Sequence, residues 1–398
     1  MIFKYFGVAT FSVFSVAILC SKNLQAQVVQ PGTQTNGSQA NNIRTAVPFL
    51  LITPDARAAS MGDAGVAVQP DANSMSINPA KLAFLEMPYG FAASYSPWLK
   101  NLVPDINLAY LSGFYKLNGQ SNLGASLRYF SLGQIQLTDI NKNDLGIYSP
   151  NEFAFDLTYA KRFGNELSLA TTGRFIYSNL TSGQFSAGQQ TTAGKAFAVD
   201  VSAFYKRQTV LFNKDAIVSA GANFSNIGTK ISYVEGAPKQ FLPTNMKIGA
   251  ASTFIVDDYN QFTFALDFNK LMVPTEPIRD GNGDIIAGKD PNRSIPAGIF
   301  GSFTDAPGGL SEELKEVSIA AGAEYWYNQQ FALRAGYFYE SPQKGDRRYM
   351  TVGAGLKYNI FNIDFAYLLA NPQKSPLANT LRFSLIFNFG SNIVTNEN

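Results

Sequence analysis

The amino-acid sequence predicts an all-β protein, a 14-stranded antiparallel transmembrane β-barrel with an N-terminal hatch, or plug, segment. Three observations predict this fold. Segments of about ten residues alternate large apolar with small or polar side chains from about residue 88 to Phe389. Aromatic residues make up 13% and charged residues only 15% of a chain whose mean hydropathy is −0.04. Short and long connections also alternate between the segments, as they do in outer-membrane barrels.

The alternation is clearest between residues 151 and 163. One parity carries Phe153, Phe155, Leu157, Tyr159 and Phe163, and the other carries Ala154, Asp156, Thr158, Ala160 and Arg162. A period of two gives a strand two different faces. Because no other segment could cover so much aromatic surface, we expect the apolar face to contact lipid.

The chain begins with a pattern typical of a secretory signal peptide, residues 1–26. Lys4 precedes an apolar run from Tyr5 to Leu19, and cleavage is expected after Ala26. Lipidation of Cys20 is the weaker alternative, because the residue before a lipidated cysteine should be small. Residues 27–45 are rich in Gln, Asn, Ser and Gly, which predicts a flexible periplasmic tail.

Residues 46–87 do not alternate and are expected to form the hatch. They contain PDARAASMGDAGVA from Pro54 and then Asn78-Pro79-Ala80. Small residues and glycines permit close backbone packing, and Asn78 before Pro79 is a good helix start. A phosphate loop at Gly62-x-x-Gly65 is disfavoured, since the strand and helix that should flank it are missing.

The barrel itself is expected at residues 88–389. Its candidate strands are 88–98, 105–116, 121–131, 151–163, 166–178, 196–207, 215–227, 243–256, 260–271, 315–327, 330–340, 348–358, 361–370 and 378–389. The longest links lie at 132–150, 179–195, 228–242 and 272–314, and they fall on the side opposite the short turns. Long links are external in such barrels, so both termini, including a C-terminal tail at 390–398, are expected in the periplasm.

Charged residues of the second parity are expected to line the lumen. They are Arg128, Arg174, Asp200, Asp267, Glu324, Arg334, Asp364 and Arg382. Mixed signs favour internal ion pairs over a selective solute path. We therefore expect a hatch and lumen network that consists of Arg57, Asp63, Asn78, Glu324 and Arg334.

The longest irregular stretch, residues 272–314, is the candidate partner-binding site. Its candidate residues are Ile299, Phe300, Phe303, Asp305 and Leu310. Apolar residues in an external loop either fold down to cap the barrel mouth or form a docking surface for a partner, and both readings stay open. The spacing within 295–303 fits a helical turn better than a strand. The segment Asp280 to Asp284 opens like a calcium loop, but Ile285 and Pro291 stand where Gly and Glu are needed, so a glycine-rich turn is favoured.

Several classes of function are excluded by composition. The chain has no histidine, which removes histidine-dependent triads and histidine metal ligands. Signal cleavage would also remove its single cysteine. We expect no enzymatic activity, no catalytic residue, no metal and no cofactor. A formal net charge of +2 gives no argument for nucleic acid.

The segments quoted above carry a family resemblance. GDAGVA followed by NPA, ahead of a 14-stranded barrel, resembles the FadL superfamily of outer-membrane proteins. TPDARAASMGDAGVA, NPAKLAFL, GIFGSFTDAPGG, GAEYWYNQQFALRAGYFYE and SPLANTLRFSL together are similar to the PorV (LptO) family of the type IX secretion system.

The resemblance implies a noncatalytic barrel in the outer membrane of a Gram-negative, Bacteroidetes-like bacterium, in contact with outer-membrane lipid. It implies that the barrel receives the C-terminal domains of secreted cargo from a SprA/Sov-type translocon and delivers them to a PorU-type sortase and attachment complex. The alternative is a FadL-like channel for the uptake of hydrophobic small molecules. That channel would need an apolar lumenal pocket and a side exit, and the charged lumenal parity favours the carrier.

Overall fold

The computed structural model describes residues 40–99, 105–138, 141, 143–181, 183, 185–186, 189–370 and 380–390. The barrel unit begins at Asn41. The expected signal peptide, most of the expected N-terminal tail and residues 391–398 lie outside the described residues. Among the described residues, no helix has both the length and the apolar character to cross a bilayer.

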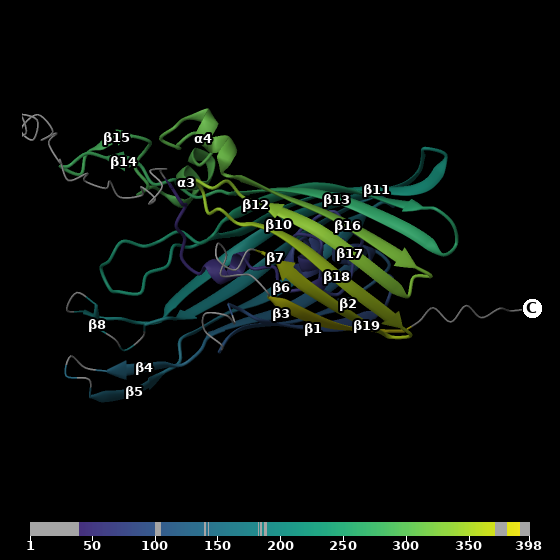
Figure 1. The fold of residues 1–398 in the computed structure, drawn as a ribbon, viewed down its shortest axis with the longest axis horizontal. Helices are drawn as coiled ribbons and strands as arrows, with labels where there is room; N and C mark the ends of the chain where they lie inside the picture. The colour runs from purple at the N-terminus through teal and green to yellow at the C-terminus, as the bar shows by residue number, and fades with distance from the viewer. Residues whose placement is uncertain are drawn as a thin grey trace, which may run out of the picture. The chain divides into compact units, whose positions relative to one another are not determined.

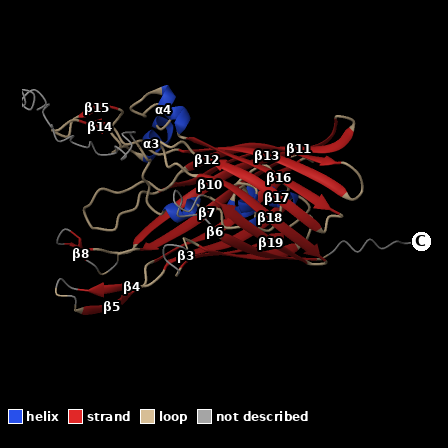
Figure 2. Ribbon diagram, viewed as in Figure 1, coloured by secondary structure: helices blue, strands red, loops and turns tan. Residues whose placement is uncertain are grey.

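Fourteen antiparallel strands close into a barrel (Figure 1; Figure 2), which confirms the predicted fold class and strand number. The order around the wall follows the order in the chain. The strands are β1 (Tyr89–Pro97), β2 (Ile106–Lys116), β3 (Ser121–Leu132), β6 (Asn151–Phe163), β7 (Leu167–Asn179), β10 (Gly194–Leu211), β11 (Lys214–Gly228), β12 (Asn245–Ile255), β13 (Asn260–Leu271), β16 (Val317–Tyr327), β17 (Phe331–Tyr339), β18 (Arg348–Tyr358), β19 (Phe361–Leu369) and β20 (Leu381–Phe389).

The long connections contain elements of their own. Short hairpins that the sequence did not predict are formed by β4 (Ile135–Thr138) with β5 (Asp144–Tyr148), β8 (Phe185–Ser186) with β9 (Gln189–Gln190), and β14 (Ile278–Arg279) with β15 (Ile285–Ala287). The helices here are α3 (Ile295–Gly301) and α4 (Leu310–Lys315). Helix α3 occupies the segment for which a helical turn was preferred over a strand. The turn at 280–284 joins β14 to β15, with the Asp280 carboxylate accepting the amides of Asn282 and Asp284.

Burial follows the predicted parity along the wall. In β6, for example, Phe155, Leu157 and Tyr159 are exposed on the outside, whereas Asp156 and Thr158 are buried in the lumen. The wall strands pair continuously with their neighbours, and the register shifts once, between β10 and β11 at Val199 and Val201. The outer face is therefore an apolar band suited to lipid.

The hatch segment packs inside this wall. It contains η1 (Pro48–Leu51), α2 (Ala56–Ser60), η2 (Ser74–Ser76) and η3 (Pro79–Phe84). The Asp55 side chain caps α2 by accepting the Ala58 amide at 2.9 Å, and Asn78 caps η3 by accepting the Ala80 amide at 3.1 Å. Apolar hatch side chains join lumenal side chains in three main buried clusters. These clusters fill the lumen between the charged residues.

Residues 41–46, which we call the strap, lie at the long-loop end of the barrel. The Asn41 amide donates to the Gln343 carbonyl at 2.9 Å, and the Ala46 amide donates to the Phe241 carbonyl at 3.0 Å. Figure 1 shows this purple start of the described chain beside α3. These backbone bonds hold residues 41–45 among the long loops, whereas both chain ends were expected on the short-turn side. From there the hatch passes through the lumen to the short-turn end, where Pro88 accepts the Lys116 amide.

Candidate functional site

A buried ion-pair network ties the hatch to the wall. Arg57 binds Glu324 of β16 through its Nε at 2.9 Å and its Nη2 at 2.8 Å, and its Nη1 binds Asp71 at 3.0 Å. The same Glu324 accepts from Arg334 of β17 at 2.6 Å, and Arg334 binds Asp364 of β19 at 2.7 Å. The structure thus brings together three residues of the expected network, Arg57, Glu324 and Arg334.

Asp63 joins a second cluster. Its carboxylate accepts from the Tyr349 hydroxyl at 2.6 Å and lies 3.4 Å from Arg382 Nη1. It also has a positive φ of 66°, directly after Gly62. The hatch bends sharply here, so Asp63 contacts strands other than those that hold Arg57.

Asn78 has a positional role. Besides capping η3, its side-chain amide donates to the carbonyls of Val66 at 2.8 Å and Ala203 at 3.0 Å. It therefore ties two parts of the hatch to β10. These three hydrogen bonds account for the burial of the Asn78 side chain, so its role is structural and no ligand is needed to explain it.

The second part of the site is the platform, residues 295–315, at the long-loop end. Lys270 of β13 and Lys344 in the link between β17 and β18 tie the platform, and Glu316 directly after it, to the barrel. Lys270 lies 3.0 Å from Glu313, and Lys344 lies 2.6 Å from Glu312 and 2.9 Å from Glu316. Glu313 also accepts the amides of residues 305 and 306. The platform is consequently a fixed part of the barrel rim.

The platform presents apolar side chains to its surroundings. The relative exposure is 78% for Phe300, 75% for Leu310, 67% for Leu314 and 40% for Phe303. Ile299 points the other way and is 9% exposed. The apolar residues of this loop were expected either to cap the barrel mouth or to form a docking surface. Ile299 is buried as a cap would be, whereas the four exposed side chains leave a surface free for a partner.

Asp305 lies beneath this surface and is 1% exposed. Burial raises the pKa of its carboxyl group above the ordinary value, and Arg293, whose Nη1 is 3.5 Å away, partly opposes this shift. Asp305, which the sequence analysis placed among the partner-binding candidates, therefore lies inside the platform and not on its exposed surface.

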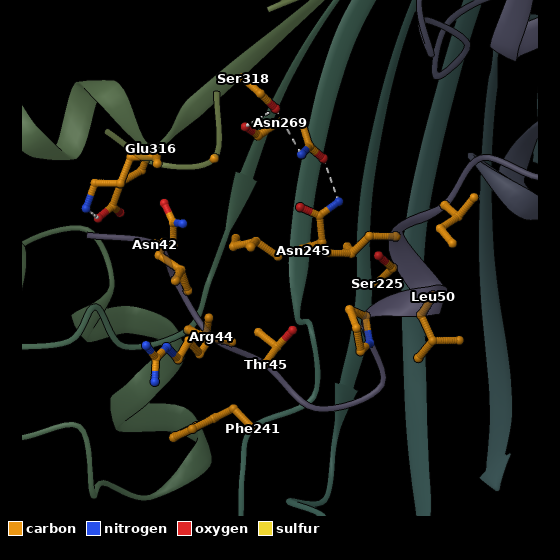
Figure 3. A pocket seen from close by; sticks show the side chains of 18 of the residues that line it. Asn42, Arg44, Thr45, Leu50, Ser225, Phe241, Asn245, Asn269, Glu316 and Ser318 are labelled. Atoms are coloured by element: carbon orange, nitrogen blue, oxygen red, sulfur yellow. Dashed lines mark hydrogen bonds and ion pairs between the residues drawn. The ribbon is translucent and has the colours of Figure 1, made fainter. Parts of the chain in front are cut away.

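A vestibule opens between the strap and the wall, with a cavity volume of about 1220 Å³. Figure 3 shows Asn42, Arg44 and Thr45 along the strap, and Asn245, Asn269 and Ser318 on strands of the wall. Asp63 and Lys247 are among the residues that line it. Sequence reasoning missed the vestibule, because the composition of residues 41–45 gives no sign of the loops that they contact.

Two other contributors were also missed. Leu314 belongs to the exposed surface, and its spacing of four residues from Leu310 could have signalled one helix face. The pairing of Arg174 was the other: it was expected to line the lumen, and it forms a separate cluster there with Asp156 at 2.7 Å and Asp200 at 3.0 Å. Among the described residues, no group of three or more acidic or cysteine side chains is placed to hold a metal ion.

Solved structures share the architecture. The TodX deltaS2S3 mutant monoaromatic hydrocarbon channel has a TM-score of 0.50 and 13% identity, and the match covers 84% of this chain and 99% of that one. The P. putida toluene transporter TodX has a TM-score of 0.49 and 13% identity, and the match covers 85% of this chain and 99% of that one. A Pseudomonas aeruginosa FadL homologue has a TM-score of 0.44 and 10% identity, with 88% of this chain and 100% of that one covered. The likeness to the first of these structures concerns the fold alone.

Sequence comparison identifies the family. No curated protein matches the chain. The family described as "Type IX secretion system protein PorV" matches residues 34–278, which is more than half of the chain. This match and the closed barrel indicate an outer-membrane protein of the secretion apparatus. The chain belongs to the PorV family of type IX secretion system proteins.

Proposed function

We propose that this protein binds secreted cargo proteins through their C-terminal domains and carries them from a SprA/Sov-type translocon to a PorU-type sortase and attachment complex. In this proposal the barrel is a scaffold in the outer membrane. Binding takes place at its long-loop end, and no chemical step is assigned to the chain.

The exposed apolar surface of the platform is the observation that carries this proposal. Phe300, Leu310 and Leu314 are more exposed than most of the lipid-facing side chains, yet they belong to helices of a long loop. Clustered apolar side chains with a polar surround are typical of protein interfaces. An exposed aromatic side chain such as Phe300 could act as an anchor that supplies much of the binding energy.

The clamp beneath the platform supports the same role. Lys270 and Lys344 hold three glutamates of one short helical region, and Thr275 donates to Glu316 at 2.6 Å. A surface that is ordered before binding loses little conformational entropy when a partner docks. A reusable carrier gains from such preorganisation, because it must bind and release many cargo molecules.

A channel for hydrophobic small molecules is less well supported. It would need a side exit through the wall and an apolar lumenal pocket. The wall strands are paired around the whole barrel, apolar clusters of the hatch fill the lumen, and the vestibule is lined by many charged and amide side chains. Filling the vestibule with a hydrocarbon would remove water from these charged groups, which costs free energy.

The test uses the triple variant Phe300→Ser, Leu310→Ser, Leu314→Ser. Epitope-tagged protein is purified from outer membranes, and cargo that stays bound is quantified by mass spectrometry. The matched control is Ile147→Ser with Ile286→Ser, which removes apolar side chains of 63% and 65% exposure from the β4–β5 and β14–β15 hairpins.

We expect the triple variant to lose most of its bound cargo while the control retains it. Both should stay heat-modifiable on gels, as folded barrels are. Undiminished cargo on the folded triple variant would contradict the proposal. Uptake of a labelled hydrocarbon by the reconstituted protein would favour the channel instead.

A further inference from the structure

We propose that the vestibule binds the end of an extended polypeptide, with its free α-carboxylate directed to Lys247 at the floor. The inference rests on the proposed function only for the origin of the peptide, which would be the C-terminal end of the cargo. The site differs from the platform in position and in shape, since it is a concave space with charged groups in its lining, whereas the platform is an exposed apolar surface.

The size of the vestibule indicates a polymer. Its volume of about 1220 Å³ exceeds the roughly 300–1,000 Å³ typical of small-molecule pockets. It lies at the long-loop end, between the strap and the wall (Figure 3), and the hatch at Asp63 and Ile77 forms part of its lining. A chain could therefore enter from the loops and stop at the hatch.

The strap offers an unpaired backbone edge along this space. Its ends are fixed by the amides of Asn41 and Ala46. Between them, the amides of residues 42–45 donate no hydrogen bond to any described residue. Backbone groups left open in this way can pair with an extended peptide, as in β-strand addition.

The opposite wall provides a polar row. Asn245 donates to the Asn269 side chain at 2.6 Å, and Asn269 donates to the Ser318 hydroxyl at 3.2 Å. They come from the adjacent strands β12, β13 and β16. Carboxamides and hydroxyls can both donate and accept, so this row can satisfy peptide groups of either kind.

Lys247 supplies an unpaired charge. It is half-buried and, among the described residues, makes no ion pair within 4.0 Å and one long hydrogen bond, 3.5 Å to the Asp63 carbonyl. Asp63 and Asp267 face it, and Asp267 keeps one oxygen without a hydrogen-bond partner among the described residues. Asp63 binds Tyr349 and Arg382, and one oxygen of Asp267 accepts the amides of residues 65 and 66 at 2.7 and 2.9 Å.

The charge of the lining as a whole agrees with an anionic ligand. Seven lysine and arginine side chains line the vestibule against five carboxylates. Lys344 and Arg347 are paired with glutamates, whereas Arg44 on the strap forms no ion pair among the described residues. A charge that is partly withdrawn from water gains most from an opposite charge.

An acidic oligosaccharide is the rival occupant, and the aromatic lining disfavours it. Sugars commonly stack on free aromatic faces. Here Lys230 lies 4.1 Å from the Phe241 ring centroid, Arg382 lies 5.4 Å from that of Trp98, and Tyr349 stacks on Phe338 at 5.0 Å. These faces are therefore already covered.

The test measures binding of fluorescent peptides of about eight residues to the purified full-length protein in detergent. Each peptide copies the C-terminus of one of the host's own type IX cargo proteins, and each is made as a free acid and as a C-terminal amide. We expect the acid to bind about tenfold more tightly than the amide, which removes the charge that Lys247 would hold.

Variants assign this preference to one residue. Lys247→Met should abolish it, Lys247→Arg should keep it, and Lys239→Met, which removes an exposed cation of the same lining, should leave it unchanged. Heat-modifiability shows that each barrel is folded. Equal binding of acid and amide to the unaltered protein would overturn the proposal, as would a Lys247-dependent affinity for oligogalacturonate without any for the peptides.

The outcome can be separated from that of the proposed function. The platform variant should lose intact cargo and still bind the short free-acid peptides. If the peptides fail to bind while that variant loses cargo, the vestibule proposal is wrong and the carrier stands. If the peptides bind through Lys247 but the variant keeps its cargo, the platform is wrong and the vestibule stands.

Discussion

Arg57 of the hatch makes two hydrogen bonds to the carboxylate of Glu324 on the wall, at 2.9 and 2.8 Å. Such a paired geometry fixes both the distance and the orientation of the two groups. Arg334 binds the same carboxylate, so one glutamate joins the hatch to two neighbouring strands. The hatch is therefore held by a specific lock within the lumen, in addition to its apolar packing.

Breaking this lock should loosen the hatch. Glu324→Gln leaves two arginines with no carboxylate at their centre, and removing one partner of a buried ion pair typically costs about 3–5 kcal/mol. We expect a lower midpoint for thermal loss of the folded form and greater entry of large antibiotics into cells. The control is Arg348→Gln, which breaks an exposed pair with Asp346 worth about 0–1 kcal/mol. Equal midpoints for the two variants would argue against the lock.

Gly62 should not tolerate a side chain. It has a φ of 69°, and a Cβ there would lie 2.5 Å from the Tyr337 backbone nitrogen and 2.7 Å from its oxygen. Because backbone atoms cannot move aside cheaply, Gly62→Ala should prevent the hatch from seating. We expect reduced heat-modifiable protein in membranes, compared with Gly119→Ala, where nothing lies within 4 Å. Normal levels of the Gly62 variant would show that this contact is not needed.

The glutamate clamp should control the mobility of the platform. Glu316→Gln removes the charge that Lys344 and Lys270 share. We expect faster hydrogen exchange of amides in residues 305–315 and unchanged exchange in the wall. Glu166→Gln, which affects an exposed pair with Arg207 at 3.6 Å, is the control. If exchange in the platform is unaltered, the apolar contacts beneath it are sufficient to hold it.

The stability of the platform should depend on pH through Asp305. Burial raises the pKa of this carboxyl group, so the folded platform binds the proton more tightly than the unfolded chain does. The resulting stabilisation is present at low pH and is lost as the pH rises through the raised pKa. Asp305→Asn stays neutral, so its platform amides should be better protected than those of the unaltered protein at pH 7.5. The difference should shrink towards pH 4, and a ratio that does not change with pH would contradict this.

Much of the fold could be predicted from local sequence. Alternation in segments such as Phe153 to Phe163 determines which face meets lipid, and turn lengths then determine the number of strands and their direction. The bounds of β6, β13 and β18 agree with their predictions to within a residue. The extra hairpins were missed because their short strands carry too few alternating residues to show a period.

The candidate site was harder to predict, because its contacts join residues that are far apart in the chain. Arg57 and Glu324 could be expected to meet, since Arg57 lies in the hatch and Glu324 lies on the strand face that was predicted to line the lumen. The burial of Asp305 could not be predicted, because a carboxylate in a polar loop gives no sign of its own burial. The position of the strap among the long loops could not be predicted, since the composition of a segment indicates its solvation but not which loops it contacts.

The orientation of the long-loop end tests the account most directly, because the platform, the strap and the vestibule all lie there. Cys20, in the expected signal peptide, is the only cysteine in the sequence, so single engineered cysteines can be read without background. Asn42→Cys on the strap should react with a membrane-impermeant maleimide in intact cells, whereas Asp258→Cys, in the short turn after β12, should react only after lysis. Labelling of Asp258→Cys but not of Asn42→Cys in intact cells would contradict the account.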